Sequence, residues 1–130
     1  MTPFHTLHDV SSHQDKHTLY VLVRTDIPAA QQMVQAAHAA AEAARTFYRP
    51  EHGIASLIVL AVADKARLHQ AQRQLQAKGI DCELFHEPDF GIGDSALATQ
   101  PLRDEQRKHL RRWPLWAPSP AHAVDTREAA

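Results

Sequence analysis

The chain has 130 residues, of which 44% are hydrophobic and 22% charged, and its formal net charge is −1. This length supports one hydrophobic core and is too short for two ordinary domains. The near-neutral balance excludes a polycation, so any contact with nucleic acid must use a local basic surface. The single cysteine, Cys82, excludes an internal disulfide. Without an apolar run of ~20 residues or a basic-then-apolar start, we expect a cytoplasmic protein with no membrane span.

Both ends of the chain are polar and lack a periodic apolar pattern. We therefore expect residues 1–17 to form a disordered, histidine-rich arm and residues 117–130 a disordered tail. The spacing of the histidines in the arm matches no closed zinc site, so no metal is expected there: His5, His8, His13 and His17. The folded domain is expected to span residues 18–116.

The first half of the domain is typical of a strand, a helix and a second strand. Residues 19–23 form a short apolar run, and Asp26 is expected to cap a helix that begins near Pro28. Residues 54–62 are almost wholly apolar, as expected for a central strand covered on both faces. Apolar residues recur at helical spacing between these strands and predict the buried stripe of the helix: Met33, Ala37, Ala40, Ala44 and Phe47.

The second half predicts a helix, two strands and a last helix. Asp64 is expected to cap the helix, whose inward residues are Leu68, Ala71 and Leu75, and Gly79 stands where a left-handed cap is wanted. Ile80, Cys82 and Leu84 alternate with polar residues in a third strand, residues 95–99 form a short fourth strand, and residues 103–112 form a basic helix.

The predicted order is βαβαββα. Strands separated by helices are parallel neighbours with right-handed crossovers, and the late β–β step adds an antiparallel pair. The sequence therefore predicts a single-domain α/β fold, with a mixed four-stranded sheet and flanking helices.

Polar residues on the first helix are the first candidates for chemistry. Gln31, Gln35, His38 and Glu42 follow at steps of four, three and four, so they share one face. A solvated surface is the preferred interpretation for Glu42, which lies near Arg45. For Gln35 and His38 a solvated face and a functional role both remain open, because histidine suits proton transfer near neutral pH.

Two loops add further candidates. Arg24, Thr25 and Asp26 follow the first strand, at the end of the sheet where open α/β sheets bind ligands. Arg24 can pair with Asp26 or meet a phosphate. The segment HEPDFGIGDS, residues 86–95, carries Glu87 and Asp94 beside glycines. It is either an acidic surface turn or the source of a general base toward water. No P-loop or dinucleotide fingerprint is present, and no cofactor is expected.

The last predicted helix is basic. Its cations are either a solvated face or an RNA-facing patch in an otherwise neutral protein: Arg103, Arg107, Lys108 and Arg111.

Taken together, these motifs resemble the peptidyl-tRNA hydrolase 2 superfamily over roughly residues 18–116. The resemblance includes the segment Lys78-Gly79-Ile80 and the strand SALATQP. QAAHAA and HEPDF are most similar to a divergent branch, the peptidyl-tRNA hydrolase domain-containing proteins. The residues of the strand end and first helix that match the family pattern are Arg24, Thr25, Asp26, Gln35, His38 and Ala39.

The resemblance implies a mixed four-stranded sheet and metal-free cleavage of the ester between a peptide and the terminal ribose of tRNA. It implies that Glu87 or His38 activates water, while Gln31 and Gln35 orient the ester or stabilise its oxyanion. Ser95 would contact the ribose, beside Asp94 and the segment from Arg24 to Asp26 as substrate-binding residues. Arg24 and the basic helix (Arg103, Arg107, Lys108 and Arg111) would hold tRNA phosphates.

The alternative is a non-catalytic module that binds a tRNA end or another acylated ligand on the same scaffold, because a fold does not fix its chemistry. Gln31 stands where the family usually has a lysine, which favours this alternative. The retained Gln35, His38 and acidic loop favour the enzyme. A homodimer is compatible with either function.

Overall fold

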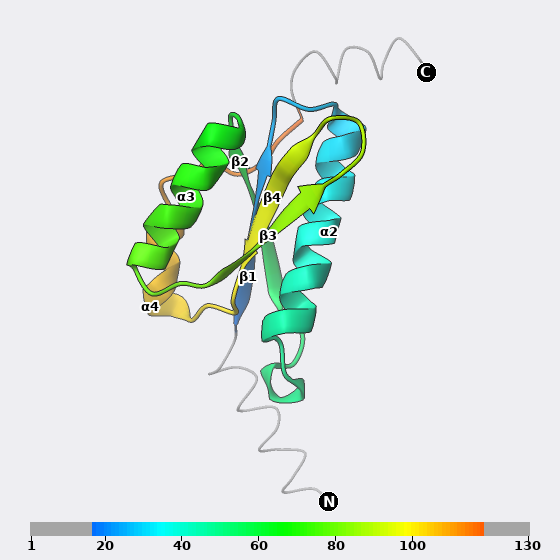
Figure 1. The fold of residues 1–130 in the computed structure, drawn as a ribbon. Coiled ribbons are helices and arrows are strands. Elements are labelled where there is room, and N and C mark those ends of the chain that lie inside the picture. The colour runs from blue at the N-terminus through cyan, green and yellow to red at the C-terminus, as the bar shows by residue number, and fades with distance from the viewer. Residues whose placement is uncertain (1–16, 119–130) are drawn as a thin grey trace, which may run out of the picture.

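The computed structural model describes residues 17–118. The predicted arm (residues 1–17) and tail (residues 117–130) therefore lie, apart from His17 and residues 117–118, outside the described residues. The helices and strands follow the predicted order (Figure 1): β1 (Thr18–Arg24), α2 (Ala29–Phe47), β2 (Ser56–Val62), α3 (Lys65–Ala77), β3 (Cys82–Glu87), β4 (Gly93–Thr99) and α4 (Asp104–Arg107).

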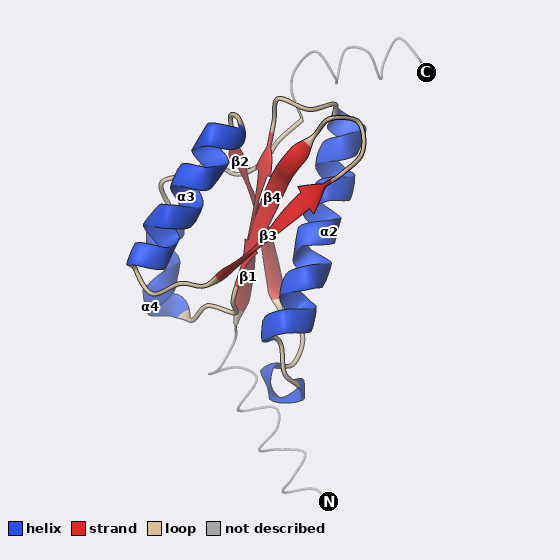
Figure 2. Cartoon of the chain, in the orientation of Figure 1, coloured by secondary structure: helices blue, strands red, loops and turns tan. Residues whose placement is uncertain are grey.

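The strands form one mixed four-stranded sheet in the order β2-β1-β4-β3. β1 and β2 are parallel, whereas β4 is antiparallel to both β1 and β3. α2 covers one face of the sheet, and α3 with α4 covers the other (Figure 2). The predicted α/β class, mixed sheet and element order are confirmed.

The second strand, β2, was expected at the centre of the sheet and is instead an edge strand. Leu57 is 57% exposed, and the fully buried strand is β1. The outer edge of β2 is covered by the segment that follows α4, because Ala61 N–H donates to the Pro114 carbonyl and Trp116 N–H to the Val59 carbonyl, both at 2.9 Å. This cover explains why an edge strand can be almost wholly apolar.

The buried stripe of α2 differs from the predicted one. Met33 is 69% exposed, and Ala37 and Ala44 are also exposed. In a helix this rich in alanine, small apolar residues lie on every side and do not single out one face. The two buried glutamines mark the inward face, because Gln35 bonds to side chains of β3 and β4 and Gln32 bonds to the β1–α2 loop and Trp116. The residues buried against the sheet are Gln32, Gln35, Ala39 and Ala43.

Of the two predicted N-caps of the long helices, one is wrong and one is confirmed. Asp26 does not cap α2, whose N-cap is Pro28 without a side-chain bond, because its carboxylate pairs with Arg24. Asp64 does cap α3, since it accepts from Arg67 N–H at 2.9 Å. The predicted inward face of α3 is confirmed, and Gly79 has the expected positive φ of 77°.

The predicted basic helix of residues 103–112 is much shorter. α4 has four residues and is followed by a 3₁₀ turn over Lys108–Leu110. Leu110 is the residue of these two elements that is buried, so little tertiary packing supports a longer helix.

Candidate active site

Gln35 lies at the centre of a polar cluster between α2 and the edge of the sheet. Its side chain is fully buried, because it belongs to the sheet-facing stripe of α2. Its Oε1 accepts from Ser95 Oγ at 2.6 Å, and its Nε2 donates to Glu87 Oε1 at 2.8 Å and Gln31 Oε1 at 3.1 Å. The buried amide is thus well satisfied. We refer to Gln31, Gln35, Glu87 and Ser95 as the Gln35 cluster.

A β-bulge places Ser95 in this cluster. Phe85 pairs with Ala96 and His86 pairs with Asp94, so Ser95 has no residue of β3 opposite it. Strict alternation would put Ser95 on the same face as Leu97, against α3. The extra residue instead directs Ser95 to α2 and Asp94 to α3.

Glu87 is the last residue of β3 and the acidic member of the cluster. Gln35 donates to its Oε1, and Asp89 N–H donates to its Oε2 at 3.2 Å. These two bonds hold the pKa of Glu87 below its ordinary value, and the bond from Gln35 has the larger effect. The nearby charges of His38 and His86 make a smaller contribution. The carboxylate is therefore ionised at neutral pH, fixed on both oxygens and open to solvent.

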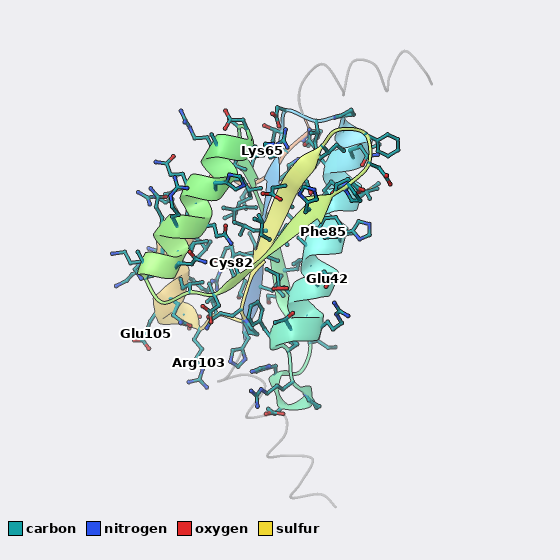
Figure 3. All side chains as sticks on the ribbon, viewed as in Figure 1. Glu42, Lys65, Cys82, Phe85, Arg103 and Glu105 are labelled. Atoms are coloured by element: carbon teal, nitrogen blue, oxygen red, sulfur yellow. The ribbon has the colours of Figure 1, made fainter. Side chains whose placement is uncertain are left out.

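His38 lies beside Glu87 but outside the hydrogen bonds of the cluster. Its exposed ring stacks on Phe85 with centroids 4.5 Å apart and planes 4° from parallel. Figure 3 labels Phe85 on β3 beside α2, with Glu42 farther along that helix. Glu42 forms a 2.6 Å ion pair with Arg45, in agreement with its interpretation as a solvated surface residue.

Arg24 is buried and its guanidinium is hydrogen-bonded within the protein, so it is not available as a phosphate ligand. Its guanidinium donates to both carboxylate oxygens of Asp26 at 2.9 and 3.1 Å, and to the carbonyls of Ile92 and Asp94 at 2.7 and 3.0 Å. The bond from Arg24 lowers the pKa of Asp26. Thr25 is tied to the end of β2 through the Val62 carbonyl. The three predicted residues therefore fasten the end of β1 to β2 and to the β3–β4 turn.

Asp94 lies on the opposite face of the sheet from the Gln35 cluster. Its two oxygens lie 2.7 Å from His69 Nε2 and 2.8 Å from His86 Nδ1. Burial raises the pKa of Asp94, but the hydrogen bonds of the two histidines outweigh burial and lower it. The structure thus separates Asp94 from Ser95, although the two are adjacent in sequence.

α4, which ends at Arg107, lies at the other end of the sheet from the β3–β4 turn (Figure 1). Arg107 donates to Tyr20 Oη at 2.9 Å, and Arg103, the N-cap residue directly before α4, is labelled in Figure 3. The structure does not bring Arg103, Arg107, Lys108 and Arg111 to the Gln35 cluster.

Gln32 and Phe90 were not singled out from the sequence. Gln32 Nε2 donates to the Ile27 carbonyl at 2.7 Å, and its Oε1 accepts from Trp116 Nε1–H at 2.6 Å. Phe90, in the β3–β4 turn, is 81% exposed and has a positive φ of 58°, which is rare for a bulky residue. The signal for Gln32 was its position three residues before Gln35, which puts both on one helical face.

Other chemistries find little support in the described residues. Between residues 17 and 118, no group of three or more His, Cys, Asp and Glu side chains is arranged to hold a metal ion. Burial and the neighbouring Asp81 raise the pKa of Cys82 to about 12, so its thiol is a poor nucleophile. No helix within the described range is long and apolar enough to cross a membrane.

The fold and site define an α/β protein that holds an ionised carboxylate beside a buried glutamine, near the carboxyl ends of its parallel strands. The chain matches the family model described as peptidyl-tRNA hydrolase PTH2 over residues 17–110, and it belongs to this family. Membership implies peptidyl-tRNA as the class of substrate. A comparison with curated proteins gave no match.

Proposed function

We propose that this chain is a cytoplasmic, cofactor-independent hydrolase of the ester between a peptide or acyl group and the terminal ribose of tRNA. We place it in the divergent peptidyl-tRNA hydrolase domain-containing branch of the family. The observation that carries the proposal is the chain of hydrogen bonds from Ser95 through Gln35 to Glu87. It fixes one ionised, accessible carboxylate at the end of β3.

Glu87 is the proposed general base. It accepts a proton from water as the water oxygen attacks the acyl carbon, and it returns this proton to the ribose oxygen as the ester C–O bond breaks. Its lowered pKa makes it a weaker base but keeps it in the basic form at neutral pH. Each carboxylate oxygen accepts one bond in the protein and retains a lone pair for water.

Gln35 and Ser95 act as positioning residues. Ser95 has no exposed surface, so its hydroxyl orients the Gln35 amide rather than contacting a ribose. Gln35 in turn fixes the direction of the Glu87 carboxylate. In this assignment Glu87 contacts the substrate, and Gln35 and Ser95 act on it only through Glu87.

Gln31 is the proposed donor to the oxyanion. Its Oε1 accepts from Gln35, and its NH2 group is not used within the cluster. An amide donor at the position of the family's lysine supplies hydrogen bonding without a full charge. A single oxyanion donor contributes roughly 10²–10³ in kcat, so we expect cleavage slower than a lysine would support. His38 lies close enough to influence Glu87 electrostatically.

The second candidate function is binding without catalysis. It is favoured by one observation: none of the residues of the Gln35 cluster is a cation. Such a module would use the same surface for an acylated tRNA end.

Single-turnover hydrolysis of a labelled N-acetyl-aminoacyl-tRNA separates the two functions. Glu87→Gln keeps the size of the side chain and removes the base, so cleavage is expected to fall about 10²–10⁴-fold while the tRNA Kd changes less than about twofold. Glu105→Gln, on α4 at the other end of the sheet (Figure 3), is the matched control. Native-like cleavage by Glu87→Gln would remove Glu87 as the base. Binding without cleavage by the native chain would establish the second function.

A further inference from the structure

A basic groove runs along the outer flank of α3. Two adjoining hollows, with cavity volumes of about 380 and about 520 Å³, share the side chains of Gln74, Arg112 and Trp113 and form one groove. Thr25 and Arg67 line its upper part. Residues from the end of α3 and from the 3₁₀ turn after α4 line the lower part, among them Lys78, Lys108 and His109.

The lining of the groove is strongly biased in charge. Arg67, Lys78, Lys108 and Arg112 supply four cations, and none of the described lining residues is acidic. The whole chain has a formal charge of −1, so this bias is a local concentration rather than a general property. A groove lined by one sign of charge attracts a polyanion.

The cations are spread along the groove and partly preorganised. Arg67 lies near the start of α3 and Lys78 is its C-cap, which spaces them roughly 16 Å along the helix axis. The Arg112 guanidinium lies 5.5 Å from the centroid of the Trp113 ring. A nucleic-acid duplex carries about one charge per 1.7 Å of its axis, so several phosphates fall within this length.

The groove begins at the same end of the sheet as the Gln35 cluster. Thr25 follows directly on Arg24, which is bonded to the β3–β4 turn through the Ile92 carbonyl. Figure 1 shows the start of α3 and the β3–β4 turn at the same end of the molecule, and Lys65 is labelled there in Figure 3. A single-stranded end leaving the groove near Thr25 is therefore at the same end of the sheet as Glu87, and reaches it by crossing the ends of the strands from β2 to β3.

We propose that this groove binds the phosphate backbone of the double-helical acceptor arm of tRNA, while the 3′ end crosses the strand ends to Glu87. This inference rests on the proposed function and moves the RNA contact from the face of α4 to the flank of α3. Lys108 is common to both surfaces. Arg107 is bonded to Tyr20, and Arg111 is outside the lining of the groove.

The test is the binding of a fluorescent, deacylated acceptor-stem minihelix between about 50 and 300 mM salt. Arg67→Gln/Arg112→Gln is compared with Arg45→Gln/Arg73→Gln, which removes the same charge from one position of α2 and one of α3 that do not line the groove. The groove variant is expected to bind at least tenfold more weakly and to lose about 0.9 per phosphate contact from the salt slope. The control is expected to change Kd less than twofold.

If the two double variants change the Kd equally, or if neither changes it, the proposal that the groove binds RNA is wrong. If the groove variant does not fold by circular dichroism, Lys78→Gln/Lys108→Gln gives the same comparison. Competition by polyglutamate as effective as by RNA of equal charge would also overturn the proposal, in favour of an acidic protein. Because the probe is deacylated, its binding does not depend on hydrolysis. The groove proposal is therefore tested independently of the role of Glu87 in catalysis.

Discussion

The hydrogen bond between Gln35 and Ser95 predicts a measurable coupling of their contributions to stability. Both side chains are fully buried and 2.6 Å apart. Gln35→Leu keeps a side chain of similar size but removes the acceptor of the Ser95 hydroxyl, which then retains only a 3.4 Å contact with the Phe85 carbonyl. Ser95→Ala leaves the Gln35 carbonyl oxygen buried without its donor. Each variant is expected to lower the free energy of unfolding by about 1–3 kcal/mol.

The double variant is expected to cost less than the sum of the single ones, because neither partner is then left unsatisfied. We expect a coupling of about 1–2 kcal/mol. The assay is urea unfolding of the four proteins, followed by tryptophan fluorescence from Trp113 and Trp116 and by far-ultraviolet circular dichroism. Gln35→Leu combined with the distant Arg45→Gln is the control and should be additive.

Additivity of Gln35→Leu and Ser95→Ala within about 0.5 kcal/mol would refute the hydrogen bond. It would also remove the link by which Ser95 orients Gln35 and, through it, Glu87.

Three further predictions concern other parts of the molecule. Phe90→Asn should raise the free energy of unfolding by about 0.5 kcal/mol, because asparagine tolerates the positive φ and the exposed ring loses little burial; a loss above ~1 kcal/mol would contradict this. The lowered pKa of Asp94 stabilises the fold above its ordinary value of 3.8 and ceases to do so as the pH falls through the folded value. Asp94→Asn should therefore be less stable than the native chain at pH 6, and urea titrations should show this difference shrinking as the pH falls below 3.8, unlike for Asp104→Asn. Cys82, with its pKa of about 12, should react with maleimide at pH 7.5 far more slowly than a free thiol, because little of it is thiolate; labelling at the rate of a free thiol would contradict the raised pKa.

Much of the fold could be predicted from the sequence, because its patterns are local. The cap at Asp64, the apolar spacing of Leu68, Ala71 and Leu75, and the glycine at position 79 all report on contacts within a few residues. The prediction that β2 is a central strand was wrong. An apolar strand has the same sequence pattern whether a neighbouring strand or a terminal segment covers its edge.

The site was predicted as a set of residues but not as an arrangement. Gln35 and Glu87 were both candidates, yet their 2.8 Å bond joins positions 52 residues apart. The bulge that separates Ser95 from Asp94 depends on strand register, which alternation alone does not give. Arg24 has a buried role because the β3–β4 turn supplies carbonyls that no local pattern shows.

The pH dependence of single-turnover cleavage of N-acetyl-aminoacyl-tRNA, corrected for spontaneous hydrolysis, tests the role of Glu87 most directly. The pKa of Glu87 lies below its ordinary value of 4.5, so a Glu87 base stays ionised as the pH falls toward that value. The rate should be flat from about pH 8 to 5 and fall only below the ordinary glutamate value. A loss of rate already in the neutral range would indicate a histidine base and contradict the account. Absence of cleavage at every pH would contradict it as well.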